Sequence, residues 1–271
     1  MTHQAAQFIG GIPAHYDEGL GPHLFVDYAA DLACRTAAGK PATVLETAAG
    51  TGIVTRLLRD ALPGSCSLVA SDLNAPMLEI ARKKFGVGEN VEFRPADAAA
   101  LPFGEGTFDA LACQFGVMFF PDKEKAYREA RRVLATGGRY HFSVWDSFEF
   151  NPFARIVHET VAGFFTPDTP AFYSVPFGYY RIDDIKSSLV KAGFDDICAH
   201  VIRIDKTIPR AQAFARALIL GNPIIDEIKA RGTADADAVV AAVAEGLQRA
   251  FGQDPGRMPL QAIVFSARKR G

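Results

Sequence analysis

The sequence predicts an α/β fold in which helices alternate with the strands of a parallel sheet. From residue 43 to 145, short apolar runs of strand length alternate with segments whose apolar residues recur at helical spacing. The chain has 271 residues, of which 49% are hydrophobic and 22% charged, so it can bury a substantial core. No internal repeat or low-complexity linker divides it, and we therefore expect a single domain, residues 1–271.

Five strands and three helices are expected between residues 43 and 145. The strands are TVLETA (43–48), SLVASD (67–72), VEFRPAD (91–97), FDALACQF (108–115) and GRYHFSVW (138–145). The helices are expected at about 53–62, 75–85 and 122–134. Asn74 is the expected N-cap of the second helix. Gly137 and Gly138 are expected to stop the third.

The rest of the chain is expected to cover and complete this core. Residues 1–40 should form a mostly helical lid, 41–145 the cofactor-binding core, and 146–180 and 207–257 lid or substrate insertions. Residues 181–206 and 258–271 should return to the sheet as a helix, a strand and a last strand at 259–269. Two or three alanine-rich helices are expected over 210–251, with a break at Gly221-Asn222-Pro223.

The charge balance and the apolar runs exclude several classes of partner. Lys and Arg number 29 against 31 Asp and Glu, so no overall basic field attracts nucleic acid or an anionic membrane. The longest apolar runs are shorter than the roughly 20 residues that span a bilayer. The N-terminal residues lack a secretory signal, which favours a cytoplasmic protein. We expect a small-molecule substrate, no nucleic acid and no membrane, and a homodimer is compatible with the sequence.

The cysteines do not suggest a metal centre. Cys34, Cys66, Cys113 and Cys198 are scattered and form no CxxC pair. We expect buried free thiols and no metal site.

The most informative segment is the glycine turn from Glu46 to Gly52, which joins a strand to an amphipathic helix. A dinucleotide-binding loop would require glycine three residues after Gly52, where this chain has Thr55. Glu46 would repel a pyrophosphate but could accept a hydrogen bond from a cationic amino group. The loop therefore favours an adenosine ligand without phosphates, although it could also be a tight turn packed for structure.

Two further acids end the next two strands. Asp72 lies 22 residues after Gly50, where a carboxylate can accept hydrogen bonds from both hydroxyls of a ribose. Asp97, followed by Ala98, could meet the amine of an adenine that lies beside Leu73. Each acid could alternatively cap a helix N-terminus. Acids at three consecutive strand ends favour a ligand site.

Five segments together resemble the class I S-adenosylmethionine-dependent methyltransferases, in particular the group similar to ubiquinone/menaquinone C-methyltransferases. They are VLETAAGTG (44–52), VASDLNAPML (69–78), FRPADAAALPF (93–103), FDALACQFGVMFFPD (108–122) and EARRVLATGGRYHFSVW (129–145). The resemblance implies a Rossmann-like, doubly wound, mostly parallel sheet of seven strands with the last strand antiparallel. It also implies S-adenosyl-L-methionine as cofactor and S-adenosyl-L-homocysteine as product.

The resemblance further implies a set of cofactor-binding residues: Tyr16, Glu46, Ala48, Gly50, Gly52, Asp72, Leu73, Met77, Asp97, Ala98, Gln114 and Phe115. Glu46 would lie near the methionine end of the cofactor, Asp72 would hold the ribose, and Asp97 with Ala98 would face the adenine. The loop backbone at Ala48 and Gly50 would line the methionine end.

The resemblance also concerns the floor of the site, the glycine loop and an N-terminal helix. Gln114 and Phe115 follow the fourth strand, where family members line the floor beneath the sulfonium. Ala48 stands where the family has its first loop glycine, and its methyl group is expected to shift the loop slightly without blocking the site. Tyr16 belongs to a Tyr-Asp pair that many members carry in an N-terminal helix. It could instead be a ring packed at a helix interface.

The expected reaction needs mainly positioning. The expected function is methyl transfer from S-adenosylmethionine to a small acceptor by in-line displacement, and the aromatic segment 148–180 suits an apolar or aromatic one. The catalytic residue is unassigned, because a general base is needed only for an acceptor of high pKa. His15 and His23 are the candidates, although both could be exposed or capping residues. The alternative function is a non-catalytic protein of the same fold that binds S-adenosylmethionine or S-adenosylhomocysteine.

Overall fold

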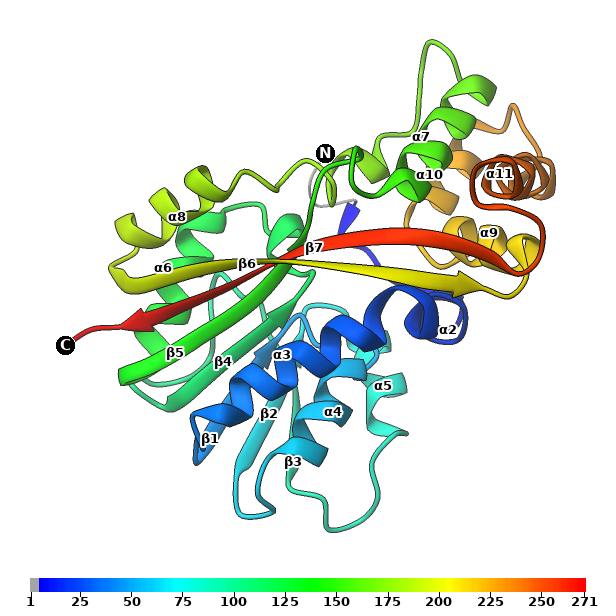
Figure 1. Cartoon of the computed structure of the whole chain (residues 1–271). Coiled ribbons are helices and arrows are strands. Elements are labelled where there is room, and N and C mark those ends of the chain that lie inside the picture. The colour runs from blue at the N-terminus through cyan, green and yellow to red at the C-terminus, as the bar shows by residue number, and fades with distance from the viewer. Residues whose placement is uncertain (1–4) are drawn as a thin grey trace.

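A single seven-stranded sheet forms the centre of the computed structural model, which describes residues 5–271 (Figure 1). The strand order is β3-β2-β1-β4-β5-β7-β6. The strands are β1 (Thr43–Thr47), β2 (Ser67–Asp72), β3 (Val91–Pro95), β4 (Phe108–Gln114), β5 (Leu134–Trp145), β6 (Phe194–Ile208) and β7 (Gly256–Lys269). Only β7 runs antiparallel to its neighbours β5 and β6. The seven strands and the antiparallel last strand confirm the predicted fold.

Helices cover both faces of this sheet. On one face α3 (Val26–Ala38) packs beside α4 (Ile53–Ala61), and their buried Leu32 and Leu58 share an apolar cluster with Val44 of β1. On the other face α6 (Lys123–Val133) packs beside α8 (Ile182–Lys191). The helix α5 (Ala75–Arg82) follows β2 and contacts β2 and β3. The doubly wound arrangement brings the carboxyl ends of β1 to β4 to one open edge.

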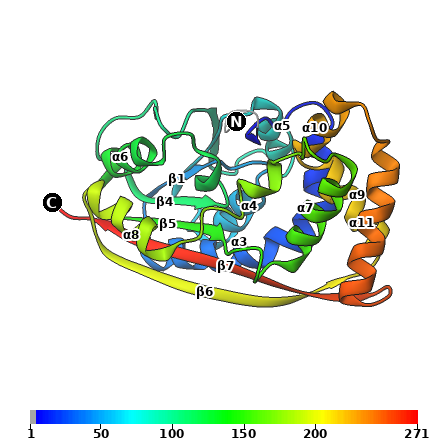
Figure 2. The ribbon, with the colours of Figure 1, turned by 90° about the horizontal axis from the view of Figure 1, so that it is seen from above.

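A helical cap stands at one end of the molecule. It consists of α7 (Pro152–Phe164), α9 (Ala211–Leu220), α10 (Ile224–Arg231) and α11 (Ala236–Phe251), and α11 packs against both α7 and α9. Figure 2 shows β6 and β7 running past the other strands to reach this cap. The three helices over 211–251 confirm the expectation for that segment. A short 3-10 turn, Phe172–Ser174, also belongs to the aromatic insertion.

The N-terminal stretch is helical from residue 12, as expected. It comprises α2 (Ile12–His15), a π-helical segment η1 (Tyr16–Phe25) and α3. Residues 1–4 of the expected lid lie outside the described part of the chain. Gly19 lets η1 approach the cap closely, because a Cβ there would lie 2.4 Å from the Cβ of Ala217 in α9. The wide turns of η1 therefore rest directly on the cap.

Two local expectations were wrong. Gly137 and Gly138 do not stop α6, which ends at Val133; they lie inside β5, where a Cβ on Gly138 would be 2.9 Å from the Asp109 carbonyl of β4. Asn74 precedes α5 as predicted, but its side chain makes no cap. Instead Asn74 Nδ2 donates to the carbonyl of Ala6 (3.0 Å), because the N-terminal segment passes over this loop.

The cysteines are only partly as expected. Cys66, just before β2, and Cys113, in β4, are buried, whereas Cys34 and Cys198 are exposed. Cys34 lies on the helix α3 and Cys198 on the edge strand β6, and both elements have a face turned to solvent. Within residues 5–271 no helix is long and apolar enough to cross a membrane.

Candidate cofactor and acceptor site

A cavity of about 130 Å³ lies at the carboxyl ends of the parallel strands. The register of β1, β2 and β3 brings Glu46, Asp72 and the chain before Asp97 to this edge. The lining contains every expected cofactor residue except Glu46 and Gly52: Tyr16, Ala48, Gly50, Asp72, Leu73, Met77, Asp97, Ala98, Gln114 and Phe115. We call it the strand-end cavity.

The glycine loop is held in left-handed backbone conformations. Ala48, Gly50 and Gly52 have φ angles of 53°, 56° and 80°. The Gly50 N–H donates to Asp72 Oδ2 (2.8 Å) and so ties the loop after β1 to the end of β2. Gly52 turns away from the cavity. A Cβ on Gly52 would lie 2.7 Å from the Cβ of Ala81, so this glycine permits close packing of the loop on α5.

Ala48 fits because a glycine lies opposite it. A left-handed backbone costs a residue with a Cβ roughly 1–2 kcal/mol. A Cβ on Gly116 would lie 2.4 Å from the Ala48 Cβ, so the methyl group of Ala48 occupies space that Gly116 leaves open. Ala48 still lines the strand-end cavity. The departure from a loop glycine is thus matched by a glycine after β4.

Glu46 is a buried acid with a free oxygen. It is 1% exposed, and no described residue donates to its Oε2. Burial, with a contribution from the Asp72 charge, raises its pKa to about 8. Glu46 and Gln114 line a narrow hollow beside the strand-end cavity.

Gln114 offers a second free acceptor at the same hollow. Its Nε2 donates to the carbonyl of Phe25 (3.0 Å), which fixes the orientation of the amide, and its Oε1 has no donor among residues 5–271. Two buried acceptors without donors are unfavourable unless a ligand supplies them. The hollow is therefore complementary to a cationic group with several N–H donors.

Asp72 is held rigidly. Its Oδ1 accepts from Asn74 N (2.8 Å) and its Oδ2 from Gly50 N, and burial raises its pKa against the effect of these bonds. Asn74 Nδ2 also donates to Oδ1 (3.3 Å), and because a carboxylate has about four acceptor positions, one remains for a ligand hydroxyl. Asp97 differs, because it is exposed at the cavity mouth and its Oδ1 accepts from Ala99 N (2.8 Å). Leu73 is 60% exposed beside it.

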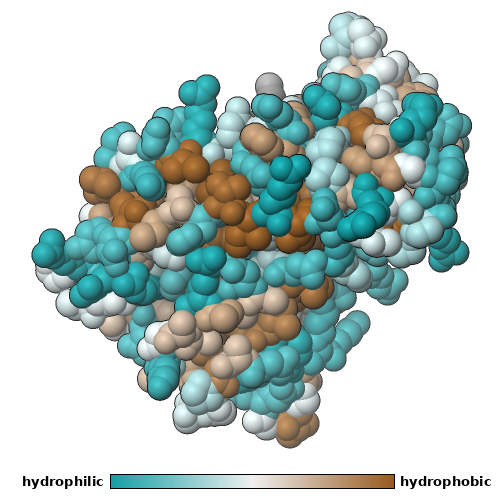
Figure 3. Space-filling view, in the orientation of Figure 1, coloured by the Kyte–Doolittle hydropathy of each residue, from teal (hydrophilic) through white to brown (hydrophobic). Residues whose placement is uncertain are grey.

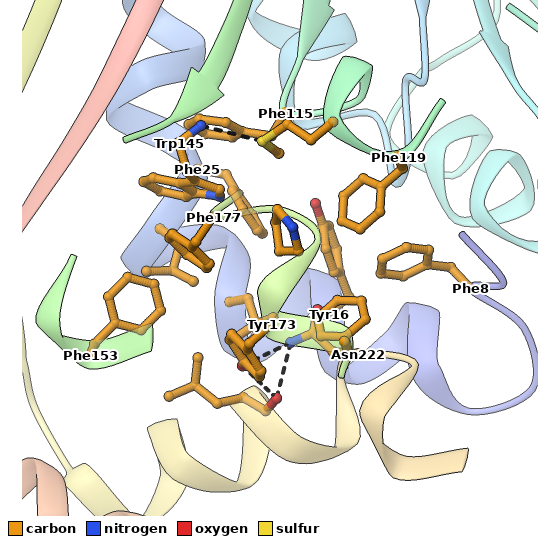
Figure 4. A pocket seen from close by; sticks show the side chains of 16 residues that line it. Phe8, Tyr16, Phe25, Phe115, Phe119, Trp145, Phe153, Tyr173, Phe177 and Asn222 are labelled. Carbon is orange, nitrogen blue, oxygen red and sulfur yellow. Dashed lines mark hydrogen bonds between the residues drawn. The ribbon is translucent and has the colours of Figure 1, made fainter. Parts of the chain in front are cut away.

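A second cavity, lined by aromatic and apolar side chains, adjoins the first (Figure 4). We call it the aromatic cavity; its volume is about 50 Å³. Its lining is Phe8, Tyr16, Leu20, Leu24, Phe25, Phe115, Met118, Phe119, Trp145, Phe153, Phe172, Tyr173, Pro176, Phe177, Leu218 and Asn222. Phe8, Tyr16, Phe115 and Phe119 line both cavities. The two spaces therefore share one wall.

Phe115 and Tyr16 form much of that wall. Phe115 has a φ of 51°, which is rare for a bulky residue, and its ring stacks on Trp145 at 4.0 Å. Tyr16 stacks on Phe25 at 4.8 Å and meets Phe8 edge-on at 5.6 Å. Burial raises the pKa of the Tyr16 phenol, with Asp72 and Asp17 contributing, so the hydroxyl keeps its proton. Tyr16 thus packs at a helix interface and also faces both cavities.

The candidate histidines lie elsewhere. His15 is exposed, and His23 packs edge-on against Phe214 at 5.7 Å. Burial and the Lys206 charge lower the pKa of His23. Within the described chain, no histidine lines either cavity.

Several lining residues were missed by the sequence analysis. Phe8 and Phe25 reach the site from the N-terminal segment, and no local pattern marks them. Asn222 lies at the Gly-Asn-Pro break, which was noticed only as an interruption between helices. A polar residue at such a break was the one available signal.

Part of the chain matches a known protein family. Residues 44–138 match the family described as a methyltransferase domain. This match identifies residues 44–138 as a methyltransferase domain. The demethylmenaquinone methyltransferase of Thermus thermophilus is 46% identical to this chain over 112 residues, which are 41% of this chain and 49% of that protein. The match thus spans about half the length of that relative.

Solved structures share the fold at low sequence identity. Phosphoethanolamine N-methyltransferase 2 of Haemonchus contortus, in complex with S-adenosyl-L-methionine, superposes with a TM-score of 0.60 and 18% identity, covering 96% of this chain and 57% of that chain. The cyclase SpnF superposes with a TM-score of 0.55 and 18% identity, covering 90% of this chain and 81% of its own. Proteins with different reactions therefore share this fold.

Proposed function

We propose that this protein transfers a methyl group from S-adenosylmethionine to a small, apolar or aromatic acceptor by in-line displacement. The main support for the proposal is the wall that the strand-end cavity and the aromatic cavity share. Two carboxylates suited to the amino and ribose groups, Glu46 and Asp72, lie on one side of it, and the aromatic cavity lies on the other. Tyr16 and Phe115 stand between them.

The strand-end residues fit the polar groups of this cofactor. Glu46 and Gln114 would accept hydrogen bonds from its ammonium group, because both residues line one hollow and each has an oxygen without a donor. Asp72 would accept from the ribose hydroxyls, one of them through its remaining lone pair and the other in exchange for the longer hydrogen bond from Asn74 Nδ2. Asp97, at the mouth, would meet the adenine beside Leu73. The cofactor supplies a methyl group on a positively charged sulfur.

The aromatic side would position the acceptor and exclude water. Holding two reactants in the right geometry can lower a barrier by about 7–11 kcal/mol, so positioning can supply much of the rate. The lining of the aromatic cavity, over the described residues, contains no carboxylate, histidine or lysine. Tyr16 keeps its proton and can donate but not act as a base at neutral pH. The acceptor atom must therefore be nucleophilic without help from these walls.

The lids belong to the same proposal. The aromatic cavity is closed by Phe8 and Tyr16 from the N-terminal segment and by Phe172, Tyr173 and Phe177 from the 146–180 insertion. With a volume of about 50 Å³ it has room for a few water molecules. We therefore propose that these segments move apart to admit the acceptor and close again before transfer.

Binding and turnover test the proposal separately. Calorimetry should show binding of both S-adenosylmethionine and S-adenosylhomocysteine, and S-adenosylhomocysteine release should rise with a member of a panel of quinols, phenols, carboxylates and amines. Binding without release for any acceptor would instead support the non-catalytic alternative. No binding at millimolar ligand would exclude both functions.

A further inference from the structure

The walls of the aromatic cavity carry no charge. Its polar side chains, within the described chain, are Tyr16, Trp145, Tyr173 and Asn222, and all are neutral at physiological pH. A charged ligand would lose its hydration here without gaining a partner of opposite charge. The cavity therefore selects neutral molecules, and the few polar atoms decide which of them bind best.

Asn222 is a polar residue of this lining whose side chain has hydrogen-bonding capacity to spare. It is 7% exposed and lies at the break between α9 and α10. Its Nδ2 donates to the Leu218 carbonyl (3.0 Å) and lies 3.5 Å from the hydroxyl of Tyr173, which itself donates to Leu218 O at 2.9 Å (Figure 4). Because a carbonyl can only accept, the nitrogen of the amide must face Leu218.

This orientation leaves Oδ1 without a partner. Capping the end of α9 uses only the nitrogen of Asn222, and within residues 5–271 both hydrogen bonds of this side chain are made by Nδ2. Asn222 lines the aromatic cavity but not the wall shared with the strand-end cavity. An acceptor without a donor in this cavity wall is complementary to a ligand donor that lies away from the cofactor.

We propose that Asn222 determines acceptor specificity by accepting a hydrogen bond from a neutral donor group, such as a hydroxyl, on an atom other than the one that is methylated. This inference rests on the proposed function, since it takes the aromatic cavity as the acceptor site. It names the substrate class as a neutral, largely apolar molecule with one hydrogen-bond donor remote from the reacting atom.

The binding of matched small molecules to the full chain tests the proposed role of Asn222. The probes are p-cresol, its isostere p-xylene, 4-methylanisole, which can accept but not donate, and 4-methylbenzoate, which is charged. We expect p-cresol to bind about tenfold more tightly than p-xylene or 4-methylanisole. We expect 4-methylbenzoate to bind most weakly. Equal affinity for p-cresol and p-xylene would overturn the proposal.

Two variants test which side chain causes the preference for p-cresol over p-xylene. Asn222→Leu should reduce the preference for p-cresol over p-xylene to about one, because the side chain keeps its size and loses the acceptor. Tyr173→Phe is the matched control: it removes the neighbouring hydroxyl and leaves Asn222 Oδ1 in place, so the preference should remain. Loss of the preference in Tyr173→Phe with retention in Asn222→Leu would assign the role to Tyr173 and refute the proposal.

A measurement on the unmodified protein covers the case in which Asn222→Leu fails to fold. The side-chain amide signal of Asn222 should shift in NMR spectra on adding p-cresol but not p-xylene, with nuclear Overhauser contacts to the p-cresol ring. No shift and no contact would overturn the inference. Calorimetry with S-adenosylhomocysteine separates the two proposals. If S-adenosylhomocysteine does not bind, the methyl-transfer function is excluded, whereas the preference for p-cresol over p-xylene is still tested independently.

Discussion

Glu46 should make cofactor binding release a proton. Its pKa is raised by burial from an ordinary 4.5 to about 8, so at pH 7 about nine-tenths of the free protein carries a protonated Glu46. An ammonium group placed against it would favour the carboxylate and lower that pKa. Binding of S-adenosylhomocysteine at pH 7 should therefore release about 0.9 proton if the bound pKa falls well below 7.

The same pKa sets the sign of a stability change. A carboxyl group whose pKa is higher in the folded than in the unfolded protein binds more protons when folded. Its contribution to the free energy of unfolding is therefore fully present below about pH 4.5 and is lost as pH rises through 8, at about 1.4 kcal/mol per pH unit. By pH 7 the loss is roughly 3 kcal/mol.

Calorimetry in buffers of different ionisation enthalpy measures the proton release, and Glu46→Gln is the matched variant because glutamine keeps the shape and does not titrate. We expect release close to zero in Glu46→Gln, weaker S-adenosylhomocysteine binding at pH 8, and a free energy of unfolding less dependent on pH between 5 and 8. The reasoning fails if the parent protein releases no proton, or if Glu46→Gln releases as much as the parent.

The other predictions concern the ribose site, the glycine pair and the lid. Asp72→Ala should weaken S-adenosylhomocysteine binding more than Asp97→Ala, by about 1–3 kcal/mol per lost hydrogen bond, because Asp72 is buried and Asp97 is exposed; equal calorimetric affinities of Asp72→Ala and the parent would contradict this. Gly116→Ala should lower the free energy of unfolding by about 1–3 kcal/mol, since its Cβ would lie 2.4 Å from the Ala48 Cβ. Adding Ala48→Gly should recover part of that loss, and strictly additive denaturation midpoints would refute the contact. Hydrogen exchange in residues 10–25 and 148–180 should slow on S-adenosylhomocysteine binding, and Tyr16→Phe should lower turnover while the fold persists; unchanged exchange and normal kinetics would leave Tyr16 a packing residue.

Much of the core could be predicted because its signals are local. Strands and helices between 43 and 145 follow from apolar periodicity, and the acids at the strand ends follow from it too, since parallel strands place their carboxyl ends at one edge. Glu46, Asp72 and Asp97 were therefore predictable as neighbours before any coordinates. The boundary errors at Gly137 and Gly138 arose because a glycine inside a strand looks the same in sequence as one that ends a helix.

What the tertiary structure decided was which distant groups meet and which are left without partners. Phe8, Tyr16 and Asn222 lie more than 200 residues apart at their extremes, yet they line one cavity because η1 rests on α9. That Gly52 packs on Ala81, and that Gly116 makes room for Ala48, also depends on packing between elements. A periodic pattern reports that one face of an element is buried but not what covers it. The free oxygens of Glu46 and Asn222 depend on that covering, so only the folded chain could show them.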